Sequence, residues 1–397
     1  MHKIINTRQQ LKSICSDKLV YVYGAKTIAE RMCEFLENSD WGVKAFLVSN
    51  KYENPTVLCN KPVLRIEELI TEHFGTVIVA VGWQFSEEIV KELSQYNIDS
   101  LGVISPLFLD DLPMDIIKSN GCKKISPHTA IAEDTHIFAD KTSEILIESG
   151  VVIHSKVRIF ASQGSRITIS KNTLLHESSF VWAEEANIIV GRHSCLSKKS
   201  SLIGQKSFII IGDSTTIGEE AKVSAKEESS LYIGNNCSIG NRTICDAARH
   251  ATVKLGTKIW LQYNGRIAAD GGMISIGDGT TMNSNFQIGC ERSKIEIGED
   301  NMFSFYIKMD AGSHEIIDVN TNSIIDNSMP IVTGNHVWLG LGSTLLPGCS
   351  IGEGTIIGAL SLVNKSVPSN SICAGIPSRV IRNNIKWRRI KTGKSEC

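Results

Sequence analysis

One short pattern recurs along most of the chain at an almost fixed interval. Apolar-x-apolar units, each followed by a Gly or a polar residue, end at residues 148, 170, 191, 212, 234, 256, 277 and 298, so the steps are 22, 21, 21, 22, 22, 21 and 21 residues. Such a fixed period is typical of a solenoid, because each repeat buries its apolar face only by stacking on its neighbours. A β-sandwich with strands spaced at roughly 8–12 residues would not produce these steps.

A shorter period lies inside each repeat. Ile211, Ile217 and Val223 are six residues apart, and Ile233, Ile239 and Ile244 follow the same spacing with one step short by one residue. Aliphatic residues at six-residue intervals are the hexapeptide repeat of a parallel β-helix, in which each hexad forms one short face. Gly, Asn and Asp after each aliphatic residue suit the turns between faces. The sequence therefore predicts a β-helix over residues 122–378.

The repeat breaks once. The unit after the one ending at 298 ends at 334, a step of 36 residues, and the next step, from 334 to 352, is only 18. About fifteen residues must therefore leave the coil as an extruded loop near 299–330. This loop contains the stretch "IKMDAGSHEIID" at 307–318. Loops on a rigid scaffold often carry function, so His314 becomes a candidate catalytic residue.

The N-terminal part of the chain has a different pattern. Alternating strands (19–25, 42–49, 76–82, 100–105) and helices (26–39, 65–73, 86–96) predict a small Rossmann-like α/β domain over residues 1–105. Its first turn has one Gly, and Lys26 and Ile28 stand where a dinucleotide fingerprint needs small residues, which disfavours NAD. A sugar-nucleotide site and a purely structural role both stay open. Residues 106–121 are expected to be a linker.

Composition excludes several classes of function. The formal net charge is −1, so no nucleic-acid partner is expected. The eleven Cys include no C-x-x-C pair, which indicates reduced thiols rather than disulfides or zinc ligands. A carbonic-anhydrase-like β-helix would need a cluster of His ligands for its metal. The ten His include no H-x-x-x-x-H pair, so no metal site is expected. No signal peptide or membrane span is apparent. We expect a cytoplasmic protein, free or at the inner face of the membrane beside polysaccharide-assembly enzymes.

The C-terminal third resembles a known family. The segments "HVWLG" (336–340), "PGCSIGEGTIIGALSLVNKSVP" (347–368) and "AGIPSRVIR" (374–382) are similar to those of left-handed β-helix (hexapeptide-repeat) acyltransferases, above all the galactoside, maltose and capsular polysaccharide O-acetyltransferases. The N-terminal domain more weakly resembles the domain that precedes such helices in bacterial sugar acyltransferases. The resemblance implies a left-handed β-helix, acetyl-CoA as co-substrate, and an O-acetyltransferase that acts on a bacterial surface saccharide, either capsular or O-antigen polysaccharide.

The resemblance also assigns the catalytic His. The family's catalytic His lies in the loop before the "VWIG"-like motif, which here corresponds to His314, 24 residues before Trp338. A neutral imidazole is suited to take the proton of an attacking hydroxyl. A carboxylate should orient that ring, and Asp310, Glu315 and Asp318 are all within reach in sequence.

Binding residues follow from the same resemblance. Trp338 is expected to wall the channel for pantetheine and acceptor, and Leu341 and Ala359 to contact the coenzyme through the backbone, with the Leu341 amide a candidate oxyanion donor. Asn285, with Asn283 nearby, is a candidate acceptor ligand or a turn residue. The cations expected at the coenzyme phosphates are Lys365, Arg379 and Arg382. The basic tail, 379–397, is expected to serve the coenzyme, to attract an anionic polysaccharide or to be solvated.

Several alternatives stay open at this level. An N-acyltransferase for a nucleotide-linked amino sugar is favoured by the Rossmann-like domain. A pure scaffold is the third possibility, and an acyl-enzyme on Cys349 or Cys373 is disfavoured because both occupy core or turn positions of hexads. By resemblance we expect a homotrimer with active sites between subunits, so that His314 of one chain faces the coenzyme on the next. The acceptor is expected to be an oligo- or polysaccharide whose sugar the sequence does not specify.

Overall fold

The computed structural model describes most of the chain in two compact units. The described residues are 2–15, 19–25, 29, 32, 33, 36, 41–51, 54–69, 71–81, 83–105, 108, 122–312, 314–325 and 328–389. The first unit comprises 1–116, 125–135 and 147–156, and the second comprises 117–124, 136–146 and 157–397. The boundaries at 105, 121 and 378 that the sequence suggests stay a prediction.

The N-terminal unit contains a mostly parallel seven-stranded sheet. The strand order is β1-β7-β6-β2-β3-β5-β4, and only the β4–β5 pair is antiparallel. Two apolar clusters contain the buried faces of this sheet. The predicted Rossmann-like organisation is therefore present. The elements are β1 (Lys3–Ile5), α1 (Arg8–Ile14), β2 (Leu19–Tyr23), β3 (Gly42–Val48), β4 (Val57–Leu58), β5 (Lys61–Arg65), β6 (His73–Val79), α3 (Trp83–Leu93) and β7 (Asn97–Ile104).

Some local predictions for this unit were wrong. The helix expected at 65–73 is only a 3₁₀ turn, Ile66–Leu69, and strand β6 already begins at His73. Helix α1 was not predicted, although its capping box joins Thr7 and Gln10, a recognisable start signal. The helix expected at 26–39 and the linker at 106–121 lie largely outside the described residues.

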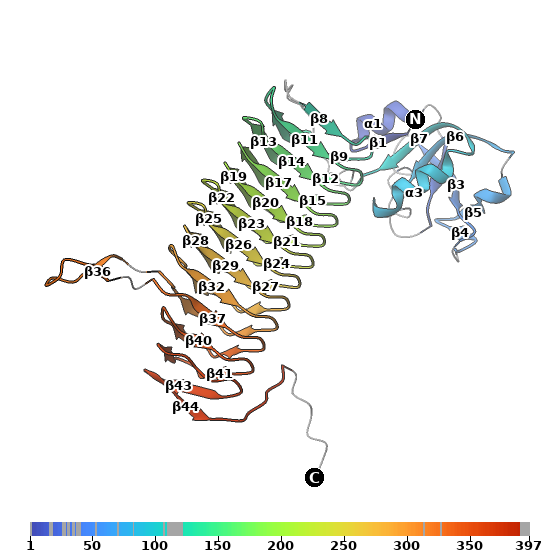
Figure 1. The fold of residues 1–397 in the computed structure, drawn as a ribbon. Helices are drawn as coiled ribbons and strands as arrows, with labels where there is room; N and C mark the ends of the chain where they lie inside the picture. Colours follow the sequence, from blue (N-terminus) through green and yellow to red (C-terminus); the bar gives the residue numbers. More distant parts are fainter. Residues whose placement is uncertain are drawn as a thin grey trace, which may run out of the picture. The chain divides into compact units, whose positions relative to one another are not determined.

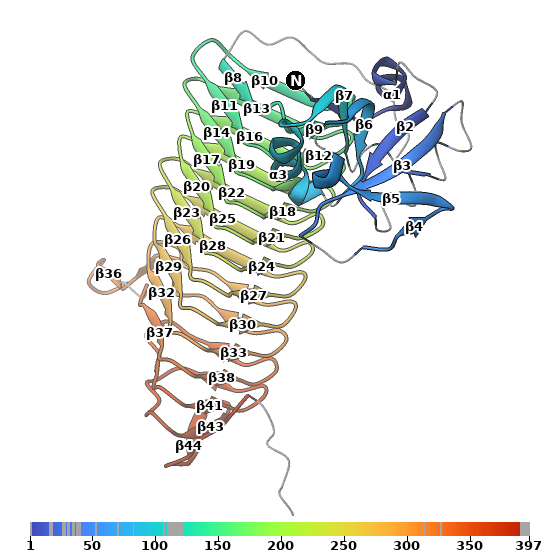
Figure 2. The same cartoon turned by 90° about the vertical axis from the view of Figure 1, so that its right-hand side faces the viewer.

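The rest of the chain forms a parallel β-helix with three faces, which confirms the predicted fold class (Figure 1). Each coil passes through face I, face II and face III in that order. Face I, seen in Figure 2, has thirteen strands. They are β9 (Ala130–Ile131), β12 (Val152–Ile153), β15 (Leu174–Leu175), β18 (Cys195–Leu196), β21 (Thr216–Ile217), β24 (Ser238–Ile239), β27 (Trp260–Leu261), β30 (Thr281–Met282), β33 (Met302–Phe303), β38 (Trp338–Leu339), β41 (Ile356–Ile357), β43 (Ile372–Gly375) and β44 (Ser378–Arg382).

Faces II and III have eleven strands each. Face II comprises β10 (His136–Ala139), β13 (Arg158–Ser162), β16 (Phe180–Glu184), β19 (Ser201–Gln205), β22 (Lys222–Lys226), β25 (Ile244–Ala248), β28 (Arg266–Asp270), β31 (Gln287–Ile288), β34 (Lys308–Met309), β39 (Thr344–Leu345) and β42 (Leu362–Val363). Face III comprises β8 (Cys122–Ile125), β11 (Glu144–Ile147), β14 (Arg166–Ile169), β17 (Asn187–Val190), β20 (Phe208–Ile211), β23 (Ser230–Ile233), β26 (Thr252–Leu255), β29 (Met273–Ile276), β32 (Lys294–Ile297), β37 (Ile331–Thr333) and β40 (Ser350–Ile351).

Aliphatic residues fill the interior in register. On face III, Ile209 pairs with Leu231 and Leu231 with Val253, and all three side chains are fully buried. The hexad residues Ile211, Ile217 and Val223 are buried as predicted. In the next coil the inward residue is Cys245 rather than Ile244, which restores a six-residue step from Ile239 and corrects the irregular spacing in the sequence. Strand alternation turns Ile244 outward.

Buried polar residues form a ladder at the corner between faces III and I. The Ser194 and Thr215 hydroxyls donate to the Gly212 and Gly234 carbonyls, each at 2.8 Å. The Thr215 amide in turn donates to Ser194 Oγ at 3.1 Å, and the Cys237 amide donates to Thr215 Oγ1 at 3.1 Å. These small polar side chains form hydrogen bonds with backbone amides and carbonyls of the turns, which would otherwise be buried without partners.

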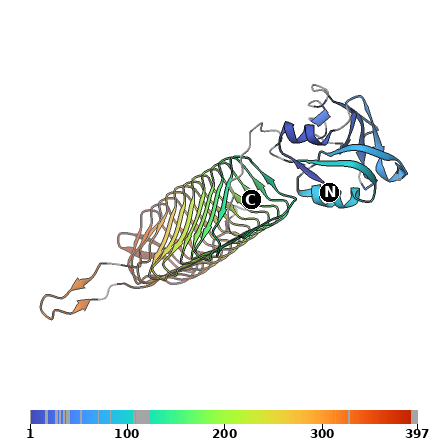
Figure 3. The same ribbon diagram turned by 90° about the horizontal axis from the view of Figure 1, so that it is seen from above.

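The loop interrupts this register where the sequence indicated. At the same corner, the residues with positive φ include Gly279, Asp300, His336 and Gly354, with steps of 21, 36 and 18 residues. The extra residues leave the helix after β34, at the corner between faces II and III. They form a hairpin of β35 (Ile316–Ile317) and β36 (Ile324–Ile325), which projects from the helix (Figures 1 and 3).

The stack of inward aliphatic side chains predicts that substitutions at adjacent positions of one strand differ in their effect on stability. We expect Ile209→Ala to lower the free energy of unfolding by about 2–5 kcal/mol, because it leaves a cavity in a fully buried stack. Ile210→Ala, the matched control on the outer surface of the same strand, should cost less than about 1 kcal/mol. Urea unfolding followed by circular dichroism measures both. Equal losses would contradict the assignment of inward and outward positions.

Candidate active site

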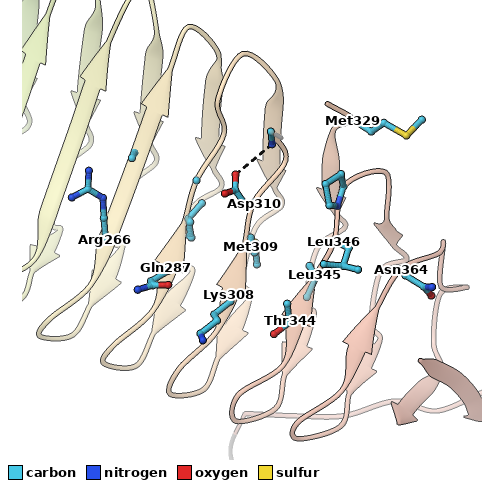
Figure 4. A pocket seen from close by; sticks show the side chains of 15 residues that line it. Arg266, Gln287, Lys308, Met309, Asp310, Met329, Thr344, Leu345, Leu346 and Asn364 are labelled. Carbon is cyan, nitrogen blue, oxygen red and sulfur yellow. Dashed lines mark hydrogen bonds between the residues drawn. The ribbon is translucent and has the colours of Figure 1, made fainter. Parts of the chain in front are cut away.

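A hollow lies on face II beside the base of the extruded loop (Figure 4). Its volume is about 880 Å³. Three consecutive coils supply Arg266, Gln287 and Lys308, and the coil after the loop supplies Thr344. The other lining residues are Ala268, Ile288, Gly289, Met309, Asp310, Gly312, Met329, Leu345, Leu346, Pro347 and Asn364.

Small residues make the hollow. Gly289 occupies an outward position next to Asp310, and a Cβ at Gly289 would overlap the Asp310 carboxylate. A Cβ at Gly312 would meet the Glu291 side chain and backbone. Two glycines therefore let the chain pass close to the previous coil as it leaves the helix. The walls offer cations at Arg266 and Lys308, a carboxylate at Asp310 and amides at Gln287 and Asn364, groups that suit a polyhydroxylated ligand.

His314 is two residues beyond the pocket wall. It follows Gly312 at the start of the loop, and the loop returns to the same wall at Met329. The imidazole is exposed, and it has no hydrogen bond within the part of the chain that the structure describes. The loop thus carries a solvent-accessible His close in sequence to Gly312, which lines the hollow.

The three candidate carboxylates differ in their surroundings. Asp318 accepts hydrogen bonds from the amides of Asn320 (2.7 Å) and Thr321 (3.1 Å), which lower its pKa and tie it to the hairpin turn. Asp310 lines the hollow and accepts a 3.3 Å bond from the Gly312 amide (Figure 4). Glu315 is exposed. Asp310 and Glu315 therefore keep more freedom to orient His314 than Asp318 does.

The predicted coenzyme residues lie at another corner of the coil. Leu341 connects β38 to β39 and Ala359 precedes β42, so both lie at the corner between faces I and II, where both are exposed. His314 lies at the corner between faces II and III. The full width of face II therefore separates the predicted base from these residues within one chain.

The remaining predicted residues are placed as follows. Trp338 lies on face I, half-buried under the side chain of Trp387. Asn285 has φ of 62° at the corner between faces I and II, and its carbonyl oxygen Oδ1 lies 3.4 Å from Asn264 Nδ2, which is the turn role that the sequence left open. The exposed cations Lys365, Arg379 and Arg382 lie in the last coils.

Sequence reasoning missed the hollow itself. Arg266, Gln287 and Lys308 are the first residues of β28, β31 and β34, one above another. Aligning the coils at the 21- to 22-residue step would have stacked these three polar positions directly before the loop. The predicted sites were drawn instead from the C-terminal motifs, which do not include this part of face II.

Thiol and metal chemistry find no support among the described residues. They contain no cluster of metal-ligating side chains and no disulfide. Burial raises the pKa of the Cys349 thiol to about 12 and also raises that of Cys373, so neither is a ready nucleophile.

Comparison with known proteins gives partial matches. No family model matches the chain. It is 28% identical over 131 residues to the polysialic acid O-acetyltransferase of Escherichia coli O1:K1 / APEC, a match over 33% of this chain and 42% of that protein. It is 33% identical over 112 residues to the galactoside O-acetyltransferase of Escherichia coli K12, covering 28% and 55%.

Part of the chain is therefore similar to several O-acetyltransferases. It is also 38% identical over 93 residues to the putative colanic acid biosynthesis acetyltransferase WcaF of Escherichia coli K12, covering 23% of this chain and 50% of that one. The chain spans about half the length of the curated relatives it matches. Among solved structures, the polySia-specific acetyltransferase NeuO is 22% identical with a TM-score of 0.33, covering 55% of this chain and 91% of that one.

Within the described residues, no helix is both long and apolar enough to span a membrane.

Thiol reactivity tests the burial of the cysteines. In the native protein we expect Ellman's reagent to modify the exposed Cys59 and Cys122 quickly. Cys245 and Cys349, each buried with a pKa raised to about 12, should react only after denaturation. Peptide mapping of the labelled protein identifies the sites, and a Cys59→Ser/Cys122→Ser variant should lose the fast labelling of those two peptides. Rapid native labelling of Cys349 would contradict the buried assignment.

Proposed function

We propose that the chain is an acetyl-CoA-dependent O-acetyltransferase that acts on a hydroxyl of a surface saccharide. The observation that carries this proposal is the break in the helix, whose loop carries an exposed His314 two residues after Gly312, a residue that lines the hollow. The similarity to polysialic acid and galactoside O-acetyltransferases supports the reaction class, since both relatives are named for acetyl transfer to saccharides.

The proposed reaction is direct transfer. The neutral His314 imidazole accepts the proton of the acceptor hydroxyl while the hydroxyl oxygen attacks the thioester carbonyl carbon. The tetrahedral oxyanion accepts a hydrogen bond from the backbone amide of Leu341. The C–S bond then breaks, and the imidazolium returns its proton to the thiolate of coenzyme A. Asp310 or Glu315 orients the imidazole, and Trp338 and Ala359 line the pantetheine path.

We further propose that the site is shared between neighbouring chains of a homotrimer. Within one chain, face II separates His314 from Leu341 and Ala359. A ring in which the loop corner of each chain meets the coenzyme corner of the next brings the two sets together. Lys365, Arg379 and Arg382 then hold the coenzyme phosphates at that shared site.

An N-acyltransferase for a nucleotide-linked amino sugar is the second candidate, because the N-terminal unit has a parallel sheet whose order reverses between β2 and β6. The two reactions are distinguished by incubating a panel of capsular and O-antigen oligosaccharides and amino-sugar nucleotides with enzyme and acetyl-CoA. Mass spectrometry then detects the mass gain of one acetyl group. Mild base removes this group if it is an ester but not if it is an amide.

The base assignment predicts a separation of binding from chemistry. His314→Ala should lower kcat by roughly 10²–10⁴-fold, because the hydroxyl loses its proton acceptor. Acetyl-CoA binding, measured by calorimetry, should stay near that of the unaltered protein.

His336→Ala, on a different corner, is not a suitable control because His336 contacts the C-terminal segment. His250→Ala, an exposed ring at a corner of a distant coil, is the matched control. Normal turnover by the His314→Ala variant would contradict the proposed mechanism.

Sharing of the site predicts complementation. Arg379→Ala/Arg382→Ala should raise the KM for acetyl-CoA more than the KM for the acceptor, because the phosphates lose their cations. When this variant is co-refolded with inactive His314→Ala, mixed rings contain some sites with both an intact base and intact cations. We therefore expect activity at low acetyl-CoA to exceed the sum of the separate variants. No gain in mixed assemblies, verified by tagged co-purification, would contradict a site between chains.

A further inference from the structure

The segment after β44 turns back along the helix instead of leaving it. We call residues 383–389 the strap. The Ile385 amide donates to the Asn370 carbonyl at 2.9 Å. Further along, Trp387 contacts His336, and Arg389 contacts Asp300. These three partners occupy one corner, between faces III and I, in successively earlier coils. The strap therefore runs against the direction in which the coils stack.

Trp387 is the apolar anchor of the strap. It is 7% exposed, and its ring stacks on the His336 imidazole with centroids 3.9 Å apart and an interplanar angle of 13°. Its indole N–H donates to the His336 carbonyl at 3.0 Å, and its own carbonyl lies 3.1 Å from His336 Nε2. His336 Nδ1 lies 2.6 Å from Asp300 Oδ2. Both rings are therefore fixed by stacking and by hydrogen bonds together.

Arg389 is the polar anchor. Its guanidinium donates to Thr281 Oγ1 at 3.0 Å, to the Asn301 carbonyl at 2.7 Å and to the Gly279 carbonyl at 3.2 Å. Its Nε lies 2.8 Å from Asp300 Oδ1. With only 27% of its side chain exposed, Arg389 is held far more tightly than a solvated basic tail would be.

The strap joins the two coils between which the His314 loop is inserted. Asp300 belongs to the coil before the loop, and His336 to the coil after it. The contact between their side chains is covered by Trp387 and extended by Arg389. Since the loop adds residues between these coils, the strap supplies a further connection across the insertion, besides the pairings of β32 with β37, β33 with β38 and β34 with β39.

The strap also covers Trp338. The Trp338 and Trp387 rings are 5.8 Å apart at 47°, a tilted contact. Trp338 Nε1 is buried and has no hydrogen-bond partner among the described residues, so contacts of the ring, rather than a hydrogen bond, must set its orientation. Trp338 precedes Leu341 by three residues on the same coil.

We propose that Trp387 is a positioning residue that fixes the indole of Trp338, with Arg389 holding the strap in place. The proposal rests on the proposed function, in which Trp338 walls the pantetheine channel. Loss of Trp387 frees one side of the Trp338 ring and lets it leave the channel wall. Loss of Arg389 acts at longer range by releasing the end of the strap. The conservative variant Trp387→Phe keeps a stacked ring and should retain the position of Trp338.

The experiment has one readout that does not depend on acetyl transfer. Full-length protein is labelled with 5-fluorotryptophan, and the ¹⁹F resonance of Trp338 is assigned by its loss in Trp338→Phe. We expect Trp387→Ala to shift and broaden that resonance and Trp387→Phe to leave it close to its original position. Arg389→Ala should produce part of the change. Arg388→Ala, which removes the same charge from an exposed neighbour, should produce none.

The second readout is kinetic. Trp387→Ala should raise the KM for acetyl-CoA by about tenfold with a smaller change in kcat, and Trp387→Phe should restore it. An unmoved Trp338 resonance in both Trp387→Ala and Arg389→Ala overturns the proposal, whatever the activity. A moved resonance with an unchanged KM overturns the role in coenzyme binding. If the unaltered protein neither binds nor uses acetyl-CoA, the proposed function fails, and the resonance still decides whether Trp387 positions Trp338.

Discussion

The stacking of aliphatic side chains in register along three narrow faces is the interaction on which the rest of the molecule depends. Each coil hydrogen-bonds to the next through parallel strands, and its inward residues, such as Ile209 and Leu231, close over those of the previous coil. A single coil has too little interior to be stable alone, so stability is a sum over neighbouring contacts. This arrangement leaves the outward positions and the corners free to vary without disturbing the core.

The candidate site uses that freedom. The hollow on face II exists because outward positions are occupied by Gly289 and Ala268 between larger neighbours. The loop leaves at a corner, where an insertion disturbs only one turn, and β32 still pairs with β37 across it. A rigid stack thus fixes the base of a long loop, and the loop presents one exposed imidazole. The strap, through Trp387 and Arg389, fastens the two coils at a second corner.

The fold was predictable from the sequence because its determinants are local and repeated. The 21- to 22-residue steps, the 36-residue break and the 18-residue coil all correspond to the spacing of corner residues such as Asp300, His336 and Gly354. The N-terminal unit was less predictable, since the segment at 65–73 has helical spacing but becomes a 3₁₀ turn and the start of β6. There, pairing within the sheet outweighed local propensity.

The site was only partly predictable. His314 is a candidate from the break and from resemblance alone, whereas the hollow and the strap depend on contacts between residues in different coils. Arg389 and Thr281, for instance, are 108 residues apart in sequence. The repeat step could have aligned Arg266, Gln287 and Lys308, but it could not show the contacts of the strap, which does not follow the repeat.

A crystal structure with bound coenzyme A is the most direct test of the central claim, that the loop carries the base to a coenzyme on the neighbouring chain. We expect the thiol to lie beside Leu341 of one chain and within hydrogen-bonding distance, about 3–3.5 Å, of the His314 imidazole from another. A thiol that reaches His314 of its own chain, or a coenzyme bound away from both corners of face II, would contradict it.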